Sequence, residues 1–170
     1  GRERFIRALA AADRERCHLL LTAHGSTPRQ SFGEWLELRP AADPTLLLAR
    51  FPLAPAIDDS TLGHAPYRQI LAGILERWCV DAVMVSSLIG HDLAALTTDR
   101  PTLAVCHDYY PLWPELHCDF GDERRRFNLP ELERDLTAGP LTLFKPHSAA
   151  RWWRLREALV STLIGQRITL

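Results

Sequence analysis

A histidine and an aspartate stand side by side directly after an apolar run. The run PTLAVC begins at Pro101, and it is followed by His107 and Asp108 and then by Tyr109 and Tyr110. An imidazole changes its charge near neutral pH, and a neighbouring carboxylate can fix which ring nitrogen carries the proton. His107 and Asp108 are therefore the candidate catalytic residues, with His107 as a general base or a polar clamp on a ligand.

Each of these residues also has a purely structural interpretation. His107 could be a buried histidine that bonds a backbone carbonyl, and Asp108 could cap the turn that follows it, a role that aspartate favours. Tyr109, Tyr110 and Trp113 could stack on a sugar, or they could pin a proline-containing loop to the core. The sequence leaves both interpretations open.

Apolar runs and amphipathic stretches predict the elements that must position these residues. Runs that suit buried strands cover 17–25, 45–51, 81–87 and 101–107, whereas helical spacing marks 2–14, 67–78, 88–100, 130–136 and 149–164. Proline and glycine predict loops over 26–44 and 52–66. Strands that alternate with helices favour βαβ units, so we expect an α/β fold with a Rossmann-like parallel sheet flanked by helices.

Polar residues follow three of the expected strands. In an open α/β sheet, ligands bind in the crevice at the carboxyl ends of the strands. We therefore predict that the substrate-binding residues are His24, Ser86, Ser87, Gly90, His91, Tyr109 and Tyr110. Gly90 could instead serve only a tight turn, and His91 and Asp92 could be solvated or capping residues.

The composition is that of one soluble globular domain. The chain has 170 residues, of which 46% are hydrophobic and 24% charged, and its formal net charge is −1. A single domain over 1–170 is expected, without a nucleic-acid partner, because the arginines are scattered except at 124–126. No apolar stretch reaches the ~18 residues of a spanning helix and no signal-peptide core is visible, so a cytoplasmic protein is expected.

Several common chemistries do not fit the sequence. The nucleophile motif GxSxG and the nucleotide-binding motifs GxxxxGK[ST] and GxGxxG are absent, so we expect no cofactor. Cysteines without CxxC spacing predict buried, reduced thiols, here Cys17, Cys79, Cys106 and Cys118. We predict no metal site, although ligand types alone would allow zinc at His107, Asp108, His117 and Cys118, in a spacing that matches no standard pattern.

The middle of the chain resembles a known enzyme family. Residues 80–122 read VDAVMVSSLIGHDLAALTTDRPTLAVCHDYYPLWPELHCDFGD, which resembles the amino-terminal, acceptor-binding domain of GT-B fold glycosyltransferases of the family 4 type. That family shows a strand and turn of the form PD-V-V-H-x-H-H-L-x-G, followed by G-x-P-x-V-x-T-x-H-D-Y-W-x-x-C-P-R. The matching positions are Asp81, Val83, Leu88, Gly90, Pro101, Val105, His107, Asp108, Tyr109 and Pro114.

The resemblance implies one half of a two-domain enzyme. Its substrates would be a nucleotide-sugar donor and a glycan, lipid-linked or small-molecule acceptor, in a retaining and metal-independent reaction of bacterial polysaccharide or glycolipid synthesis. His107 would touch the donor sugar or the acceptor hydroxyl, and the aromatic loop would shape the acceptor site. A carboxy-terminal domain would hold most of the sugar-nucleotide contacts, and peripheral membrane association and homo-oligomerisation are compatible with this picture.

The sequence also departs from the family pattern. Met84, Ser86 and Ser87 stand where the family often has histidines, and Trp113 and Glu115 replace the cysteine and arginine of C-P-R. A non-catalytic, glycosyltransferase-like binding or interaction module therefore stays as the alternative function.

The resemblance further implies a missing first strand, which in the family would precede Gly1. The chain would then be an internal fragment whose sheet lacks its central member. Backbone groups left unpaired in a core are costly, so we expect the strands at 17–23 and 81–87 to pair directly, or another chain to lie between them.

Overall fold

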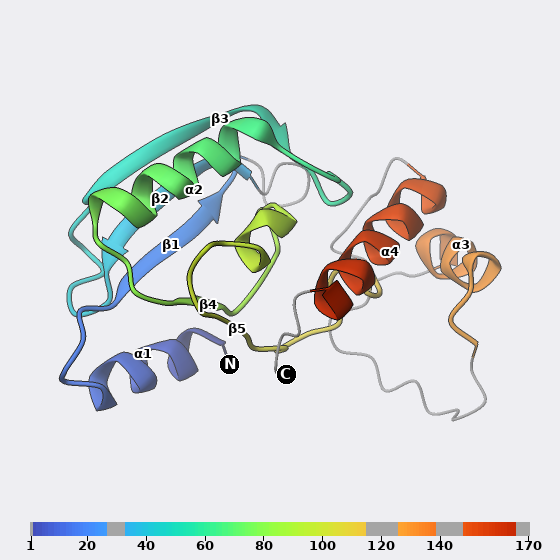
Figure 1. Ribbon diagram of the computed structural model, residues 1–170. Helices are drawn as coiled ribbons and strands as arrows, with labels where there is room; N and C mark the ends of the chain where they lie inside the picture. The colour runs from blue at the N-terminus through green and yellow to red at the C-terminus, as the bar shows by residue number, and fades with distance from the viewer. Residues whose placement is uncertain (1, 27–32, 115–125, 139–147, 166–170) are drawn as a thin grey trace.

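The computed structural model describes residues 2–26, 33–114, 126–138 and 148–165, and it has a mixed α/β architecture (Figure 1). One sheet has three antiparallel strands in the order β1-β2-β3, namely β1 (Leu19–His24), β2 (Gly33–Pro40) and β3 (Ala49–Ile57). A second sheet pairs β4 (Val83–Val85) with β5 (Thr102–Ala104) in parallel. The α/β class is thus confirmed, whereas a Rossmann-like half of a GT-B fold stays a prediction.

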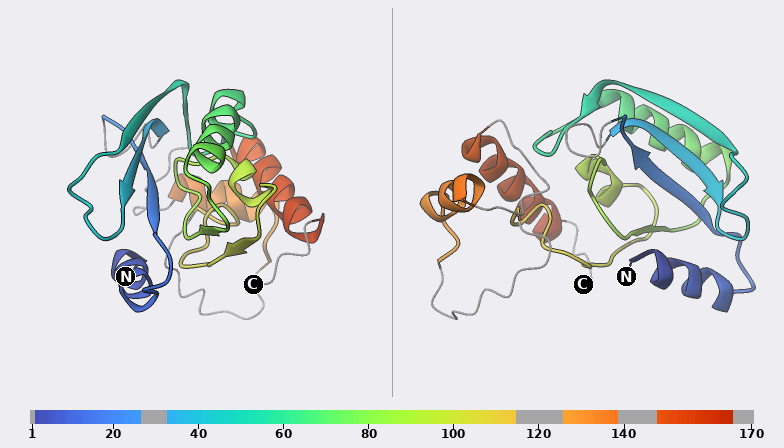
Figure 2. Two further views of the ribbon diagram at one scale, coloured as in Figure 1. Left: turned by 60° about the vertical axis from the view of Figure 1, so that its left-hand side comes forward. Right: turned by 180° about the vertical axis from the view of Figure 1, so that it is seen from behind.

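Four α-helices and one 3₁₀ turn are described. They are α1 (Arg2–Ala12), α2 (Ala65–Arg77), the 3₁₀ turn η1 (Leu93–Leu96), α3 (Leu129–Ala138) and α4 (Ala149–Gly165). α2 lies along the three-stranded sheet, and α3 and α4 pack side by side at the opposite end of the molecule (Figures 1 and 2). None of the described helices has the length and apolar character needed to cross a bilayer.

Three apolar clusters hold these elements together. The first lies under α2 and joins the inner face of the sheet to Tyr67, Leu71 and Leu75. The second packs the β4–β5 region and η1 against Leu155 and Leu159 of α4. The third lies between α3 and α4 around Trp113, Leu132 and Trp152. Loops that follow β4 and β5 are therefore fixed from behind by α4.

Strand β2 lies where we predicted a loop. Its sequence alternates: Leu36 and Leu38 are buried, and Leu36 belongs to the cluster under α2, while Trp35, Glu37 and Arg39 occupy the other face. Such a period-two pattern is typical of a strand with one buried face. Because a hairpin reverses the chain at each turn, β1, β2 and β3 are antiparallel, and the prediction that 17–25 and 45–51 belong to a parallel sheet is wrong.

Strand β3 extends into the predicted proline-rich loop. It runs to Ile57 and therefore includes Pro52 and Pro55. Because β3 is at the edge of its sheet, a proline there need not remove a ladder hydrogen bond. The helix predicted over 88–100 shrinks to η1, a single short turn.

Direct pairing of β1 with β4 is also wrong, since the two strands belong to separate sheets. Leu21 and Ala23 of β1 nevertheless share an apolar cluster with Val83 of β4, so both strands border one core. A strand from another chain between them stays a prediction.

The cysteines were predicted to be buried, which is wrong for the three that are described. Cys17, Cys79 and Cys106 are free thiols, as expected, but all three are exposed. Cys17 precedes β1 and Cys106 follows β5, so both lie just beyond the strand that we expected to bury them. Cys118 lies outside the described residues.

Candidate functional site

The candidate site lies at the carboxyl ends of the two parallel strands. Val85 of β4 is in register with Ala104 of β5, and the backbone N–H of Val105 donates to the carbonyl of Val85 at 2.8 Å. Ser86 directly follows β4, and the segment that leads to His107 directly follows β5. Both segments therefore begin at the same edge of the two-stranded sheet. Ligands of open α/β sheets bind at such strand ends.

Buried polar atoms without partners gather in the segments that follow these two strands. Ser86 Oγ, Asp92 Oδ2 and His107 Nε2 are all buried and have no hydrogen-bond partner within the described part of the chain. A large majority of buried polar atoms in native proteins are hydrogen-bonded, so each exception calls for an explanation. A bound polar ligand would satisfy such atoms.

His107 itself is partly buried beside α1. The ring of Phe5 contacts the imidazole edge-on, with the two ring centroids 5.2 Å apart. His107 and Asp108 form no hydrogen bond with each other within the described residues. Asp108 Oδ1 instead accepts the backbone N–H of Tyr110 at 3.1 Å, so its capping role is the one seen in the structure.

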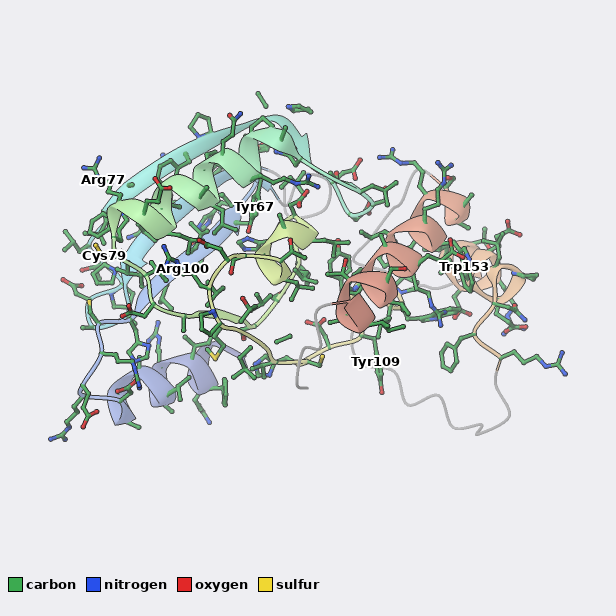
Figure 3. All side chains as sticks on the ribbon, viewed as in Figure 1. Tyr67, Arg77, Cys79, Arg100, Tyr109 and Trp153 are labelled. Carbon is green, nitrogen blue, oxygen red and sulfur yellow. The ribbon has the colours of Figure 1, made fainter. Side chains whose placement is uncertain are left out.

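Two of the loop aromatics attach the loop to other parts of the fold, Tyr110 to the loop between β3 and α2 and Trp113 to α3. The Tyr110 hydroxyl donates to the carbonyl of Asp59 at 3.3 Å, and the Trp113 indole donates to Asp135 at 2.8 Å. Burial, followed by the nearby Asp59, Asp58 and Asp108 carboxylates, raises the pKa of Tyr110. Tyr110 is thus a neutral anchor. Tyr109, by contrast, is 43% exposed and points away from α4 (Figure 3).

Three other predicted site residues take part in local structure after β4. Ser87 Oγ accepts the backbone N–H of Ile89 at 3.3 Å, and His91 Nδ1 lies 2.9 Å from the Tyr67 hydroxyl. Gly90 has a φ of 74°, which favours glycine. These contacts shape the loop and attach it to α2.

A close backbone approach ties the same loop to β2. A Cβ atom added at Gly33 would lie 2.8 Å from the carbonyl oxygen of Gly90. The amino end of β2 therefore packs directly on the loop that follows β4.

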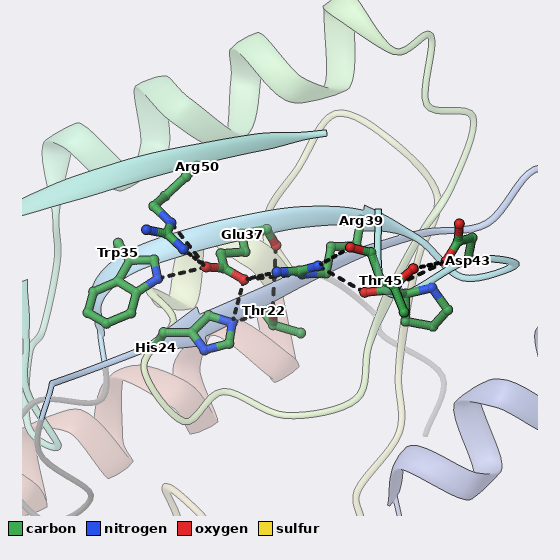
Figure 4. Close-up of polar contacts among 9 residues, drawn as sticks. Thr22, His24, Trp35, Glu37, Arg39, Asp43, Thr45 and Arg50 are labelled. Atoms are coloured by element: carbon green, nitrogen blue, oxygen red, sulfur yellow. Dashed lines mark hydrogen bonds and ion pairs between the residues drawn. The ribbon is translucent and has the colours of Figure 1, made fainter. Parts of the chain in front are cut away.

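His24 belongs to a different group of polar residues, on the outer face of the three-stranded sheet (Figure 4). Its Nε2 lies 2.8 Å from Thr22 Oγ1 and 3.5 Å from Glu37 Oε2, and its ring stacks on Trp35 with centroids 5.8 Å apart. The site thus brings together the residues after β4 and β5 but not the His24 side chain.

Glu37 is the centre of that second group, and it is not among the site residues predicted from the sequence. Both carboxylate oxygens accept hydrogen bonds, one from Arg39 and the other from Arg50 and Trp35. The bond from Arg39, then those from Arg50 and Trp35, outweigh burial and lower the pKa of Glu37 to about 2. We call Glu37, Arg39, Arg50, Trp35 and His24 the Glu37 cluster. The alternating stretch around Glu37 was the signal that could have revealed it.

Asp92 was considered only as a solvated or capping residue. It does cap η1, since its Oδ1 accepts the N–H of Ala94 at 2.7 Å, with the Arg68 guanidinium Nε at 3.7 Å. Its other oxygen is buried without a partner among the described residues. Asp92 therefore joins Ser86 and His107 as a candidate site residue.

No metal cluster marks the site among the described residues. Within the described ranges, no three His, Cys, Asp or Glu side chains are placed to hold a metal ion, and His117 and Cys118 lie outside those ranges. An open cavity of about 530 Å³ lies elsewhere, between α2, η1 and α4. It is lined by residues such as Arg68, Leu71, Leu93 and Arg100 and by none of the predicted site residues.

Comparison with known proteins gives no relative for this chain: no family model, no curated protein and no solved structure matches it.

Proposed function

We propose that this chain is the acceptor-binding domain of a glycosyltransferase that uses a nucleotide-sugar donor. The proposal draws on the motif resemblance over 80–122 and on one structural observation. That observation concerns the segments after the carboxyl ends of β4 and β5, where buried polar atoms such as Ser86 Oγ and His107 Nε2 have no hydrogen-bond partner among the described residues.

Sugar hydroxyls match these atoms chemically. Each hydroxyl can donate one hydrogen bond and accept others. It can therefore pair with an imidazole nitrogen whether or not that nitrogen is protonated, and it can also pair with a serine hydroxyl. The exposed ring of Tyr109 adds an apolar surface on which a sugar face can stack.

In this proposal His107 acts at the cleft between two domains. The acceptor oxygen forms a bond to the anomeric carbon of the donor sugar as the bond from that carbon to the nucleoside diphosphate breaks, and the acceptor's hydroxyl proton passes to the departing diphosphate. A hydrogen bond from His107 to the donor sugar or to the acceptor would hold the reacting groups in place and steady the charge that develops. Stereochemical retention, metal independence, and a role in bacterial polysaccharide or glycolipid synthesis in the cytoplasm rest on the resemblance alone.

The second candidate is a binding module that has lost catalysis. Ser87, which stands where the family often has histidine, is engaged by the N–H of Ile89, and Asp108 is engaged by the N–H of Tyr110. Both side chains therefore already stabilise local turns, a role that needs no catalysis.

Ligand binding tests the proposal directly. Saturation-transfer NMR should detect methyl glucoside or methyl mannoside, or else UDP-glucose or GDP-mannose, on the 170-residue chain. The signal should fall in His107→Ala and persist in the control His18→Ala, whose histidine is paired with Asp13. Absence of any sugar signal at millimolar concentrations, or equal binding by His107→Ala, would contradict it.

Transfer activity separates the enzyme from the binding module. We expect the 170-residue chain alone to bind without transferring sugar, because one wall of a cleft does not exclude water. Robust turnover of a nucleotide-sugar by this chain would contradict that expectation. If a longer chain carrying both halves binds sugar but never transfers it, the binding module is the correct function.

A further inference from the structure

Tyr67 is a buried residue to which the proposed function assigns no role. It lies in the first turn of α2, is only 1% exposed, and belongs to the same apolar cluster as Leu36, Ile57 and Leu71. Its hydroxyl lies 2.9 Å from Nδ1 of His91, and the two rings meet edge-on with their centroids 5.8 Å apart. A hydroxyl of the core thus contacts a predicted binding residue in the loop that follows β4.

The burial of this hydroxyl decides the direction of the hydrogen bond. Burial, followed by the nearby Asp92 carboxylate, raises the pKa of Tyr67, so the phenol keeps its proton. That proton needs an acceptor, and His91 Nδ1 is the hydroxyl's only hydrogen-bond partner among the described residues. Asp92 Oδ2 does not serve, because it has no partner within the same ranges. A proton on Nδ1 would leave the hydroxyl proton buried without an acceptor, which is unfavourable.

The tautomer of His91 follows from this direction. A neutral histidine carries one proton, on either Nδ1 or Nε2. Because the Tyr67 hydroxyl donates to Nδ1, the proton of neutral His91 lies on Nε2. Nε2 can then only donate, so any group that pairs with it must be a hydrogen-bond acceptor.

The backbone around His91 is held as well. The N–H of His91 donates to the carbonyl of Leu88 at 3.0 Å, and the next residue, Asp92, caps η1 through its Oδ1. A binding group is held in one orientation when neighbouring side chains and backbone support it in this way.

We propose that Tyr67 is a positioning residue that holds His91 as a hydrogen-bond donor toward a ligand oxygen. The tautomer is argued from the contacts of Tyr67 itself, whereas the ligand rests on the proposed function. In that function the acceptor oxygen belongs either to a sugar or to the diphosphate of the nucleotide-sugar.

Nitrogen NMR of the imidazole rings tests the tautomer without any ligand. At mildly alkaline pH free imidazoles are neutral, and protonated and unprotonated ring nitrogens resonate far apart. Wild-type His91 should carry its proton on Nε2. In Tyr67→Phe, which removes only the hydroxyl, the ratio of the Nε2–H form to the Nδ1–H form should fall about fivefold or more, the factor expected for loss of one hydrogen bond. His91→Gln assigns the signal.

Tyr110→Phe is the matched control for this experiment. It also removes the hydroxyl of a buried tyrosine, one that donates to the backbone carbonyl of Asp59, and it should leave the His91 tautomer unchanged. A proton on Nδ1 of wild-type His91, an unchanged ratio in Tyr67→Phe, or an equal change in both variants overturns the proposal. Melting temperatures check that both variants remain folded.

Ligand titration tests the donor role and separates the two sources of oxygen. Methyl glucoside offers sugar oxygens alone, and UDP offers a diphosphate without a hexose. A shift of the His91 Nε2 signal with methyl glucoside supports donation to the sugar, and a shift with UDP alone supports donation to the diphosphate.

The remaining outcomes separate this proposal from the proposed function. Binding that saturation-transfer NMR detects without any shift at His91 Nε2 overturns the donor role and leaves the proposed function standing. Absence of all binding contradicts the proposed function and, with it, the donor role. The tautomer experiment decides the role of Tyr67 in either case.

Discussion

The Glu37 cluster and the loops after β4 and β5 both bury polar side chains, but they differ in whether the buried polar atoms have hydrogen-bond partners. Both carboxylate oxygens of Glu37 have partners, supplied by two arginines and a tryptophan on neighbouring positions of the sheet. Ser86 Oγ and His107 Nε2 are buried without partners among the described residues. Fully satisfied polar groups stabilise and specify a fold, whereas unsatisfied ones are a cost that a ligand can repay.

Substitution of His107 should have the largest effect on catalytic efficiency if the loops form a functional site. In a chain that transfers sugar, His107→Ala should lower kcat/KM by about 10²–10³-fold, or roughly 3–4 kcal/mol, with little change in Tm. His64 provides the contrast, because both of its ring nitrogens have partners, the carbonyl of Pro55 and the N–H of Tyr67.

His64→Ala should therefore lower the Tm and spare the rate of the protein that stays folded. Normal kinetics with a lowered Tm in His107→Ala would remove His107 from the site. Steady-state rates and melting curves on the same preparations decide the point.

Substitution of Glu37 should have a larger effect on the free energy of unfolding than substitution of Ser86. Glu37→Gln keeps the shape but removes the charge that Arg39 and Arg50 need, so the free energy of unfolding should fall by about 2–3 kcal/mol. For a domain of this size that lowers the Tm by about 4–12 °C. Glu133→Gln, at an exposed position on α3, is the control, and equal Tm values for the two variants would show that the cluster contributes nothing.

The same cluster should make stability depend on pH. The pKa of Glu37 is lowered from an ordinary value of 4.5 to about 2, so the folded state holds the ionised form more strongly than the unfolded state does. Its stabilisation is complete above about pH 4.5 and is lost as the pH falls toward 2. Urea unfolding should show the difference between wild type and Glu37→Gln shrinking over that range, and a constant difference would contradict this assignment.

Substitution of Ser86 should have the smallest effect on the free energy of unfolding, and the sign of that change is informative. Because Ser86 Oγ has no partner in the described part of the chain, Ser86→Ala should leave the unfolding free energy unchanged or raise it by up to about 1 kcal/mol. Ser60 is the matched control, a buried serine whose hydroxyl donates to Asp58 at 3.3 Å.

Ser60→Ala should lower the unfolding free energy by about 1 kcal/mol. Urea unfolding measures both changes. Equal losses of unfolding free energy in Ser86→Ala and Ser60→Ala would mean that Ser86 has a structural partner and is not available to bind a ligand.

Local patterns were enough to predict most of the elements and to place some residues of the candidate site next to them. The helices at 67–78 and 149–164 and the strands around 83–85 and 102–104 agree with the structure within a few residues. Their apolar residues recur at a helical or strand period over a short stretch, and that period is visible in the sequence. For the same reason, the sequence alone placed Ser86 and His107 directly after strands.

The tertiary structure alone decided how the strands pair and which polar atoms have partners. β2 turns β1 and β3 into an antiparallel meander, and it brings Arg39 and Arg50 onto Glu37 from positions 2 and 13 residues away. Phe5, near the start of the described chain, contacts His107, which lies well beyond the first sheet in the sequence. Hydrogen bonding and burial depend on neighbours in space, and a one-dimensional pattern does not contain the distances between residues so far apart in sequence.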